Sequence, residues 1–300
     1  MSAPKVVLVA KETAYGRYIE DEEDAHARRL IRRGDISVAR WKKAHQNHVA
    51  TLKLVHRVLK TAGATVWQVR GAQVAFDPTD AVLVVAVGGD GTLLAASHHM
   101  NRVPVLGVNS SPEHSVGFFC AARSENVTQK LEAALLGKLA KIKLSRMEVA
   151  LNGRTISRHV LNEALFCHAI PAATSRYILR CGRSREEQRS SGIWVSTAAG
   201  STGAAHSAGG KLMPFSSKRI QAVVREPYLV MGKPYRMSRI EIPNTAKLTV
   251  QSKMQDARLF LDGPYKQTKV GLGDTITMQT SPEPLTVLGL NAKRRTVPVK

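Results

Sequence analysis

Residues 88–92 read Gly-Gly-Asp-Gly-Thr and place one carboxylate among three glycines, directly behind an apolar run. The run, Ala81 to Val87, has the composition of a strand that is buried on both faces of a parallel sheet. Where such a strand leads into a helix, free backbone N–H groups attract phosphate, and glycines let the phosphate come close. Asp90 would repel an anion, so it indicates a chemical role, either holding a metal ion or accepting the proton of an attacking hydroxyl. The combination favours phosphoryl transfer.

The glycines of this loop could also serve a tight turn that binds nothing. Three glycines in four positions behind a buried strand favour a ligand. No lysine-bearing P-loop pattern occurs in the chain, which excludes an ordinary P-loop nucleotidase. The loop resembles one that NAD kinases, phosphofructokinases and diacylglycerol or sphingosine kinases share. It therefore indicates a phosphoryl-transfer superfamily and leaves the substrate open.

Two later segments carry further polar groups. Asn162-Glu163 is more often a solvated strand edge than a site, yet a carboxylate beside an amide suits a pair of ribose hydroxyls. The segment Ser196–Gly210 is made almost entirely of small and hydroxyl residues, and it could be a flexible low-complexity loop. Because the strand-like Ile193–Val195 precedes it and helix-favouring alanines follow Ser201, it indicates a polar site that allows close approach.

The elements that must position these groups alternate between strand and helix in the first half of the chain. This alternation predicts a doubly wound α/β domain, whose ligand site lies at the carboxyl ends of the strands. The glycine loop lies at such an end. The predicted strands are Val6–Ala10, Ala64–Val69, Ala81–Val87 and Val103–Val108, and the predicted helices cover 42–62, 92–99 and 124–136.

The second half of the chain changes character near residue 141. Asn152-Gly153 between two strand-like runs is a strong hairpin signal. We expect an α/β phosphate-binding domain over 1–140, a β-rich, sandwich-like dinucleotide-binding domain over 141–290 and a loose basic tail over 291–300. One short helix is expected at 202–208. The predicted strands of the second domain are 177–181, 193–196, 220–224, 240–242, 248–251, 259–261 and 285–288.

Composition bounds the function classes. A hydrophobic content of 43% supports a folded core, and no apolar run approaches the ~18–20 residues that span a bilayer. The net charge of +21 fits a nucleic-acid binder or a basic enzyme surface that attracts anionic substrates. We favour the enzyme, because the charges are spread along the chain and an aromatic content of 5% provides no base-stacking platform.

The spacing of the cysteines and the composition of the N-terminal segment bear on the expected cellular location. Three scattered cysteines without metal-ligand spacing are expected to be buried free thiols, which fits a reducing cytoplasm. The N-terminus lacks the long apolar stretch of a signal peptide, and five consecutive acidic residues at 20–24 disfavour a mitochondrial presequence. We expect a cytoplasmic protein with no membrane partner.

Taken in order, the three segments resemble the NAD kinase family. The matching pattern is Gly-Gly-Asp-Gly-Thr, then Asn-Glu, then Ser-Thr-x-x-Gly-Ser-Thr with Ser-Ala-Gly-Gly behind it. The resemblance is strong over residues 81–212 and is expected to extend over the chain. The segments 5–11, 107–110 and 225–227 resemble the branch that contains the mitochondrial and plant NADH-preferring kinases.

The resemblance implies an activity and roles for single residues. The terminal phosphoryl of ATP would pass to the adenosine-ribose 2′-hydroxyl of NAD or NADH, with Asp90 as the general base. Gly89 and Gly91 would let the loop amides contact the triphosphate, and Thr92 would start the helix. Mg²⁺ or another divalent cation would accompany ATP, with no protein ligand assigned to it. The dinucleotide would be held by Asn162, Glu163, Arg189, Thr202, Gly203, Ala204, Ala205, His206 and Ser207.

Two positions depart from the commoner family pattern. That pattern has an aspartate where this chain has Ser191, and Ala-Tyr where it has Gly203-Ala204. The family residues contact the dinucleotide, partly across a subunit interface. The departures leave open which residues contact the nicotinamide end, and they leave open the preference between NAD and NADH. Ser-Ser-Gly at 190–192 again resembles the mitochondrial-type branch.

The sequence also allows other functions. A diacylglycerol- or sphingosine-type lipid kinase would share the glycine loop, but it would need a membrane-binding surface, for which the sequence gives no sign. A nucleic-acid-binding protein would use the +21 charge. Polyphosphate could replace ATP as donor on a basic surface. A homodimer is the oligomer that the resemblance implies.

Overall fold

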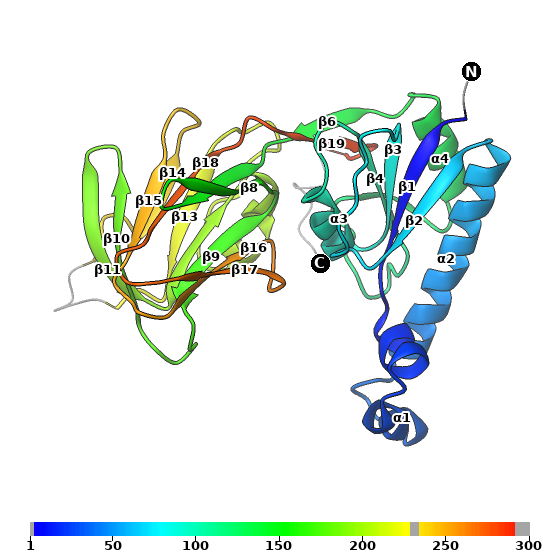
Figure 1. Cartoon of the computed structure of the whole chain (residues 1–300), viewed down its shortest axis with the longest axis horizontal. Coiled ribbons are helices and arrows are strands. Elements are labelled where there is room, and N and C mark those ends of the chain that lie inside the picture. Colours follow the sequence, from blue (N-terminus) through cyan, green and yellow to red (C-terminus); the bar gives the residue numbers. More distant parts are fainter. Residues whose placement is uncertain (1–2, 229–233, 292–300) are drawn as a thin grey trace. The chain divides into compact units, whose positions relative to one another are not determined.

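The computed structural model describes residues 3–228 and 234–291. These residues form two compact units, one of helices around a sheet and one made mostly of strands (Figure 1). The first contains the described residues up to Ile142 and those from Thr286 onward, and the second contains Lys143–Leu285. No helix among the described residues is long and apolar enough to cross a membrane.

A seven-stranded sheet is the centre of the first unit, as far as the chain is described. Its order is β2-β1-β3-β4-β19-β6, and β5 pairs with β4 outside this path. Strand β1 is parallel to β2 and β3, and β4 is parallel to β3, β5 and β19. The chain leaves β1 and β3 in opposite directions across the sheet, and ligands bind at such a reversal of strand order. The strands are β1 Lys5–Ala10, β2 Thr65–Arg70, β3 Leu83–Gly88, β4 Val105–Asn109, β5 Cys120–Arg123, β6 Lys141–Leu144 and β19 Leu285–Leu288.

Helices cover both faces of this sheet. Leu106 of β4 lies in one core with Val55 of α2 and Leu131 of α4. The next residue, Gly107, faces α3, since a Cβ there would lie 3.0 Å from Leu93 Cδ1. Figure 1 shows α2 and α4 together on one face and α3 on the other. The predicted doubly wound α/β architecture is confirmed. The helices are α2 Trp41–Thr61, α3 Asp90–Ser97 and α4 Val127–Leu135, preceded by the π-helix η1 Gly16–Asp21 and by α1 Ala25–Arg32.

The second unit consists of two six-stranded sheets among the described residues, with orders β11-β10-β15-β18-β7-β8 and β14-β13-β12-β9-β16-β17. Phe166 of the second sheet and Tyr177 of the first are buried in one core, and their rings meet edge to face. The unit is a β-sandwich, as predicted. Its strands are β7 Met147–Leu151, β8 Arg154–Val160, β9 Glu163–His168, β10 Ser175–Cys181, β11 Ser184–Ser190, β12 Gly192–Ser196, β13 Ile220–Arg225, β14 Arg239–Ile242, β15 Leu248–Ser252, β16 Ala257–Leu261, β17 Lys266–Val270 and β18 Thr275–Thr280, and its two short helices are the 3-10 helix η2 Ala199–Thr202 and α5 Ala204–Ser207.

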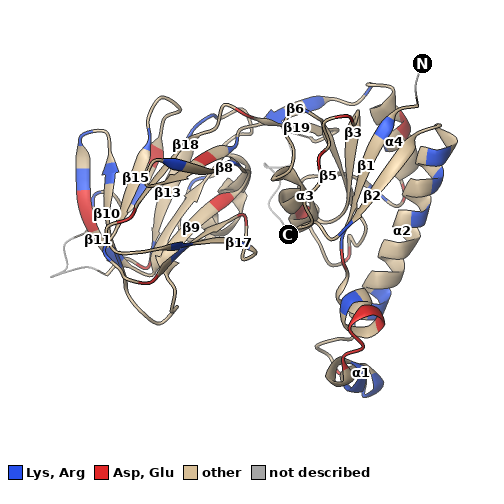
Figure 2. Cartoon of the chain, in the orientation of Figure 1, with Lys and Arg blue, Asp and Glu red and all other residues tan. Residues whose placement is uncertain are grey.

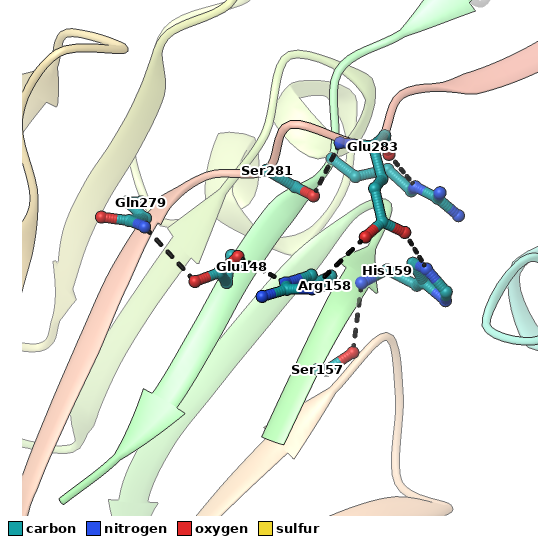
Figure 3. Close-up of polar contacts among 8 residues, drawn as sticks. Glu148, Ser157, Arg158, His159, Gln279, Ser281 and Glu283 are labelled. Atoms are coloured by element: carbon teal, nitrogen blue, oxygen red, sulfur yellow. Dashed lines mark hydrogen bonds and ion pairs between the residues drawn. The ribbon is translucent and has the colours of Figure 1, made fainter. Parts of the chain in front are cut away.

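A polar network joins the start and the end of the second unit (Figure 3). The Nε of the fully buried Arg146 donates to the Glu283 carbonyl at 2.6 Å, and the Ser281 amide donates to the Arg146 carbonyl at 2.8 Å. The Glu283 carboxylate lies 2.8 Å from His159 Nε2 and 3.7 Å from the half-exposed Arg158. The hydrogen bond from His159 lowers the pKa of Glu283. These contacts hold the entering and leaving segments of the unit side by side.

The structure corrects the predicted place of one strand. Residues 285–288 form β19 as a strand, but β19 pairs in parallel with β4 of the first unit instead of joining the β-rich domain. The predicted range 141–290 therefore ends too late. The predicted basic tail lies outside the described residues except for Asn291. A β19–β4 pair joins segments far apart in the sequence, so no local pattern marks it.

Two helix starts also differ from the prediction. Helix α3 begins at Asp90 instead of Thr92, because the extended Gly89 serves as the residue before the helix and Thr92 is its third residue. Helix α4 begins at Val127 after Asn126, and the Ser124 hydroxyl bonds Glu125 instead of capping the helix. The first shift matters chemically, because it places Asp90 in the first turn of α3.

Candidate functional site

The glycine loop follows β3 and lies beside the end of β1. The Lys11 amide donates to the Val87 carbonyl at 2.9 Å, which holds the two strand ends together. A Cβ on Gly88 would overlap Thr92 Oγ1 and lie 2.9 Å from Lys11 Cβ, so only glycine fits there. A Cβ on Gly89 would lie 2.5 Å from Ser115 Oγ. Close packing therefore requires the glycine at 88, whereas a side chain at 89 would force the Ser115 hydroxyl to rotate away.

Gly91 differs from these two glycines. It is exposed, and a Cβ there would meet no atom within 4 Å. Its neighbours therefore do not require a glycine, but the missing side chain keeps the first turn of α3 accessible. The first N–H groups of a helix have no partner within it, and the helix dipole favours negative charge there. The start of the eight-residue α3 thus suits an anion such as phosphate.

Asp90 is held by the loop that follows β4. Its two carboxylate oxygens accept the backbone N–H groups of Phe118 and Phe119, each at 2.8 Å. These two bonds fix the carboxylate plane in place. Each carboxylate oxygen has a second lone pair, so Asp90 can still accept the proton of a bound hydroxyl. No motif in the sequence pointed to the partners at 118 and 119.

The end of β4 completes this edge of the sheet. Asn109 Nδ2 donates to the Ser115 carbonyl at 2.9 Å, and Asn109 Oδ1 accepts the Ser111 amide at 3.1 Å. Ser110 donates its amide to the Gly88 carbonyl at 2.9 Å, and its hydroxyl lies 2.9 Å from Nδ1 of the buried His48. Burial lowers the pKa of His48 to about 4, so this imidazole is neutral near pH 7. These contacts connect α2 to the glycine loop.

In the second unit the structure brings Asn162 and Glu163 together with the small-residue segment. The Thr197 amide donates to the Asn162 carbonyl at 2.9 Å, and Thr197 Oγ1 donates to the Leu161 carbonyl at 2.5 Å. A Cβ on Gly200 would overlap the same Asn162 carbonyl. The small residue at 200 is therefore needed for direct backbone packing.

The polar side-chain atoms of this pair are buried but unsatisfied. Asn162 Oδ1 and Glu163 Oε2 have no hydrogen-bond partner among the described residues. A Cβ on Gly203 would lie 3.3 Å from Glu163 Oε2, so Gly203 borders the carboxylate. Burial, and secondly the negative charge of Asp262, raise the pKa of Glu163 to about 7. Unpaired buried polar atoms cost free energy, and a ligand with hydroxyl groups would satisfy them.

Asp262 is a site residue that sequence reasoning missed. Its carboxylate accepts the backbone amides of Leu161, Asn162 and Glu163 at 2.7, 2.7 and 3.0 Å. The only local signal is Asp262-Gly263 after a strand, which predicts a hairpin turn and nothing more. Its contacts are with residues about a hundred positions earlier, so no sequence spacing reveals them.

Comparisons with known proteins agree with these motifs. The family model described as ATP-NAD kinase N-terminal domain matches residues 11–139. A rice protein named "Probable NADH kinase" is 34% identical over 263 residues, which cover 80% of this chain and 81% of the rice protein. The chain belongs to the NAD kinase family. An Arabidopsis thaliana "NADH kinase" is 34% identical over 238 residues, which cover 69% of this chain and 73% of the Arabidopsis protein.

Solved NAD kinase structures share the fold. An NAD kinase from Archaeoglobus fulgidus in complex with ATP superposes with a TM-score of 0.66 at 20% identity, over 98% of this chain and 96% of the other. The yeast NADH kinase complexed with NADH gives 0.71 at 13% identity, over 97% of this chain and 85% of the other. The likeness extends over both units, so the fold of each is that of an NAD kinase.

The remaining predicted residues of this NAD kinase family member are spread over its second unit. Thr202 is exposed, Ala204 and Ala205 form the start of α5, and the exposed His206 bonds the Gly210 carbonyl through Nδ1 at 3.1 Å. Ser207, the last residue of α5, is also exposed. This group continues directly from Gly203, which borders Glu163.

Arg189 lies apart from that group. It is exposed on β11, an edge strand of the other sheet, and its backbone bonds Tyr228 and the Tyr235 hydroxyl. No contact among the described residues joins Arg189 to Asn162 or Glu163. The neighbouring Gly192 has φ of 119°, and a Cβ there would lie 2.5 Å from the Phe166 carbonyl. Gly192 therefore packs tightly against the neighbouring strand β9 of its own sheet.

Proposed function

We propose that the chain transfers the terminal phosphoryl group of ATP to the 2′-hydroxyl of the adenosine ribose of NAD or NADH. Membership of the NAD kinase family supports this reaction. The fold neighbours were solved with ATP in one case and with NADH in the other. The observation that carries the assignment in this chain is the pair of buried, unpartnered oxygens of Asn162 and Glu163, which suits a diol.

The phosphate side of the reaction is assigned to the glycine loop. Gly91 faces open space, Gly89 is proposed to let its amide contact the triphosphate, and the amides at the start of α3 are proposed to donate to it. Thr92 Oγ1 accepts the Gly89 amide at 3.5 Å, which shapes this turn. Binding here positions the terminal phosphorus, and positioning supplies most of the rate enhancement in a loose phosphoryl transition state.

Asp90 is assigned as the general base. The ribose 2′-oxygen forms a bond to the terminal phosphorus while the bond from that phosphorus to the bridging oxygen of ADP breaks. The proton of the 2′-hydroxyl passes to Asp90, and the electron pair of the broken bond leaves with ADP. The amides of Phe118 and Phe119 hold the carboxylate in a single orientation for this transfer.

A divalent cation is proposed to arrive with ATP. The described residues contain no group of three His, Cys, Asp or Glu side chains that could hold a metal ion alone. Mg²⁺ commonly keeps several waters and binds through substrate phosphates, so we assign this ion no protein ligand of its own. When bound, it would neutralise charge on the phosphates.

Asn162 and Glu163 are assigned to the adenosine ribose. The carboxylate accepts hydrogen bonds from hydroxyls, and the Asn162 amide both donates and accepts. Thr202, Gly203, Ala204, Ala205, His206 and Ser207 are proposed to line the rest of the dinucleotide. Arg189 is proposed to meet the nicotinamide half or a phosphate. Because the rice and Arabidopsis relatives are named NADH kinases, NADH is expected to be the better acceptor.

A homodimer and a cytoplasmic location complete the proposal. The dimer rests on the family resemblance, and light scattering of the purified chain tests it. The location rests on the three free cysteines, of which Cys120 is buried and Cys167 and Cys181 are half-buried. Localisation of a tagged chain tests that assignment.

No observation favours the other hypotheses. Family membership points away from the lipid kinases that share the glycine loop. Figure 2 shows Lys and Arg on α1, α2, β10 and β11, thus in both units and not on a single element. This distribution fits attraction of anionic substrates better than a nucleic-acid groove.

The decisive experiment is a coupled assay for NADP(H) formation. ATP and polyphosphate are each crossed with NAD and NADH, and diacylglycerol with labelled ATP serves as the lipid control. We expect turnover with ATP and both dinucleotides, faster with NADH, and none with diacylglycerol. Absence of turnover with either dinucleotide would refute the proposed function. A gel-shift at physiological salt that shows tight nucleic-acid binding would reopen the alternative.

A further inference from the structure

Asp262 occupies the turn between β16 and β17, beside the start of β9. Leu261 is the cross-strand partner of Ala164, and the Asp262 amide donates to the Glu163 carbonyl at 2.9 Å. Asp262 has φ of 51°, in the left-handed region that non-glycine residues occupy only at a cost. Asp-Gly is a pair that hairpin turns favour at positive φ, so the turn accounts for this backbone conformation. It does not account for what the Asp262 side chain contacts.

Those contacts are three consecutive backbone amides. Asp262 Oδ1 accepts from Asn162 and Glu163 at 2.7 and 3.0 Å, and Oδ2 accepts from Leu161 at 2.7 Å. Convergence of successive N–H groups on one anion fixes the backbone that donates them, and bonds to a charged acceptor are the stronger kind. The chain direction at residues 161–163 is therefore set by a side chain from another hairpin.

The same residues are held from the other side by the small-residue segment. The Asn162 carbonyl accepts the Thr197 amide and packs against Gly200, while Gly203 borders Glu163 Oε2. With their backbone amides occupied by Asp262, the side chains of Asn162 and Glu163 are the groups left for a ligand. Their oxygens Oδ1 and Oε2 are buried and have no partner among the described residues.

Asp262 interacts electrostatically with ionisable side chains from several elements. Its negative charge adds to burial in raising the pKa of Glu163. Lys266 of β17 has its pKa lowered by burial and raised again, more weakly, by Asp262. The buried Arg146, before β7, has its pKa lowered to about 10 by burial and feels the opposing charges of Glu283 and Asp262. Asp262 thus influences which proton state Glu163 adopts.

We propose that Asp262 is a positioning residue of the dinucleotide site, which holds residues 161–163 so that the Asn162 and Glu163 side chains face the bound ribose. The proposal rests on the proposed function, since it takes the ligand of Asn162 and Glu163 to be NAD or NADH. Asp262 acts through the backbone and through its charge, and it does not touch the reacting atoms.

The test compares Asp262→Asn with the matched control Asp274→Asn. Asp274 is also a turn carboxylate of the second unit, bonded to the Gly271 amide and to the Asn152 side chain. An asparagine at 262 can accept through one oxygen only, and its NH2 group opposes one backbone amide. We expect Asp262→Asn to weaken NAD(H) binding, by calorimetry and in KM, about tenfold or more, with kcat changed less than about threefold.

The pH dependence supplies a readout that a merely structural role would not move. Removing the charge at 262 lowers the pKa of Glu163, so the midpoint of the pH dependence of NAD(H) affinity should shift to lower pH. Asp274→Asn should keep both affinity and midpoint. Unchanged affinity and midpoint in Asp262→Asn, or a loss confined to kcat, would overturn the proposal.

Hydrogen exchange in the wild-type chain tests the geometry even if Asp262→Asn does not fold. The amides of residues 161–163 should exchange slowly in the free protein, and fast exchange typical of exposed loops would contradict the proposal. This measurement is independent of the substrate. If the wild-type chain neither binds nor phosphorylates NAD(H), the proposed function fails, while slow exchange would still support the role of Asp262 in fixing residues 161–163.

Discussion

The acidic groups of the two units are held in opposite ways. In the first unit, both oxygens of Asp90 accept backbone amides, from Phe118 and Phe119. In the second, Asp262 collects the backbone amides, and the neighbouring Glu163 keeps Oε2 without a partner among the described residues. In the first unit, Asp90 alone is held by backbone amides and can still bind a ligand. In the second unit, Asp262 bonds the backbone amides, and Glu163 has the oxygen that can bind a ligand.

This difference teaches where each carboxylate can act. A base must lie at a defined place relative to one proton, and two amide bonds give Asp90 that definition. A residue that binds a ribose gains more from unsatisfied oxygens, because the ligand then relieves the cost of their burial. The raised pKa of Glu163 follows first from its burial and secondly from the negative charge of Asp262.

The largest expected effect is that of Asp90→Asn. Loss of a general base should lower kcat by about 10²- to 10⁴-fold. Binding of NAD(H), measured by calorimetry, should change less than about threefold, since Asn162 and Glu163 are untouched. Asp77→Asn is the matched control, because Asp77 is an exposed turn carboxylate of the same unit that bonds Thr79. A kcat within about threefold of wild type in Asp90→Asn would disprove the base assignment.

The second prediction concerns the pH dependence of stability. The pKa of Glu163 is raised from 4.5 to about 7 in the folded chain, so the folded state binds the proton more tightly than the unfolded state. The free energy of unfolding should therefore fall as pH rises from about 4.5 to 7, by at most about 3 kcal/mol from this group.

Glu163→Gln removes this titration. The free energy of unfolding of each protein is measured by urea denaturation at several pH values. The difference between Glu163→Gln and wild type should rise in favour of the variant as pH increases from 5 to 8. A constant difference between the two proteins across that range would show that Glu163 titrates normally, and the contrast with Asp90 would lose its basis.

The third prediction separates the two units by substrate. A Cβ on Gly88 would overlap Thr92 Oγ1, and a Cβ on Gly200 would overlap the Asn162 carbonyl. Overpacking of this kind costs about 1–3 kcal/mol. Gly88→Ala should raise KM for ATP, and Gly200→Ala should raise KM for NAD(H). Gly271→Ala, whose new Cβ would come no closer than 3.5 Å to Asp274, is the control and should leave both unchanged. If either variant raised the KM for ATP and the KM for NAD(H) equally, the assignment of ATP to the first unit and NAD(H) to the second would be contradicted.

The smallest expected effect is that of Arg158→Ala in the polar network of Figure 3. Arg158 is half-exposed, and its ion pairs are 3.0 Å to Glu148 and 3.7 Å to Glu283. Such pairs contribute roughly 0.2–1 kcal/mol. The free energy of unfolding should fall by no more than that, and kcat and KM should stay at wild-type values. A loss above about 2 kcal/mol would mean that charge pairs outside the site matter as much as the buried carboxylates.

The sequence pattern correctly predicted those helices and turns that depend on interactions between residues close together in the chain. The helix expected at 42–62 is α2 at Trp41–Thr61, because its apolar residues recur at helical spacing and Gly63 lies beyond it at φ of 69°. Asn152-Gly153 forms the hairpin turn between β7 and β8 with both residues at positive φ, as expected. The place of 285–288 could not be predicted, because it depends on pairing with a strand about 180 positions earlier.

By itself, the sequence determined the doubly wound first unit, the β-rich second unit and the three motifs that mark the NAD kinase family, since periodicity, glycine spacing and small-residue turns are local properties. Only the tertiary structure decided which hydrogen-bond donors pair with which buried carboxylates. It placed the amides of Phe118 and Phe119 on Asp90, and those of residues 161–163 on Asp262. Hydrogen-bond partners of buried polar groups are set by packing between distant segments, and that packing leaves Glu163 Oε2 unpaired within the described part of the chain.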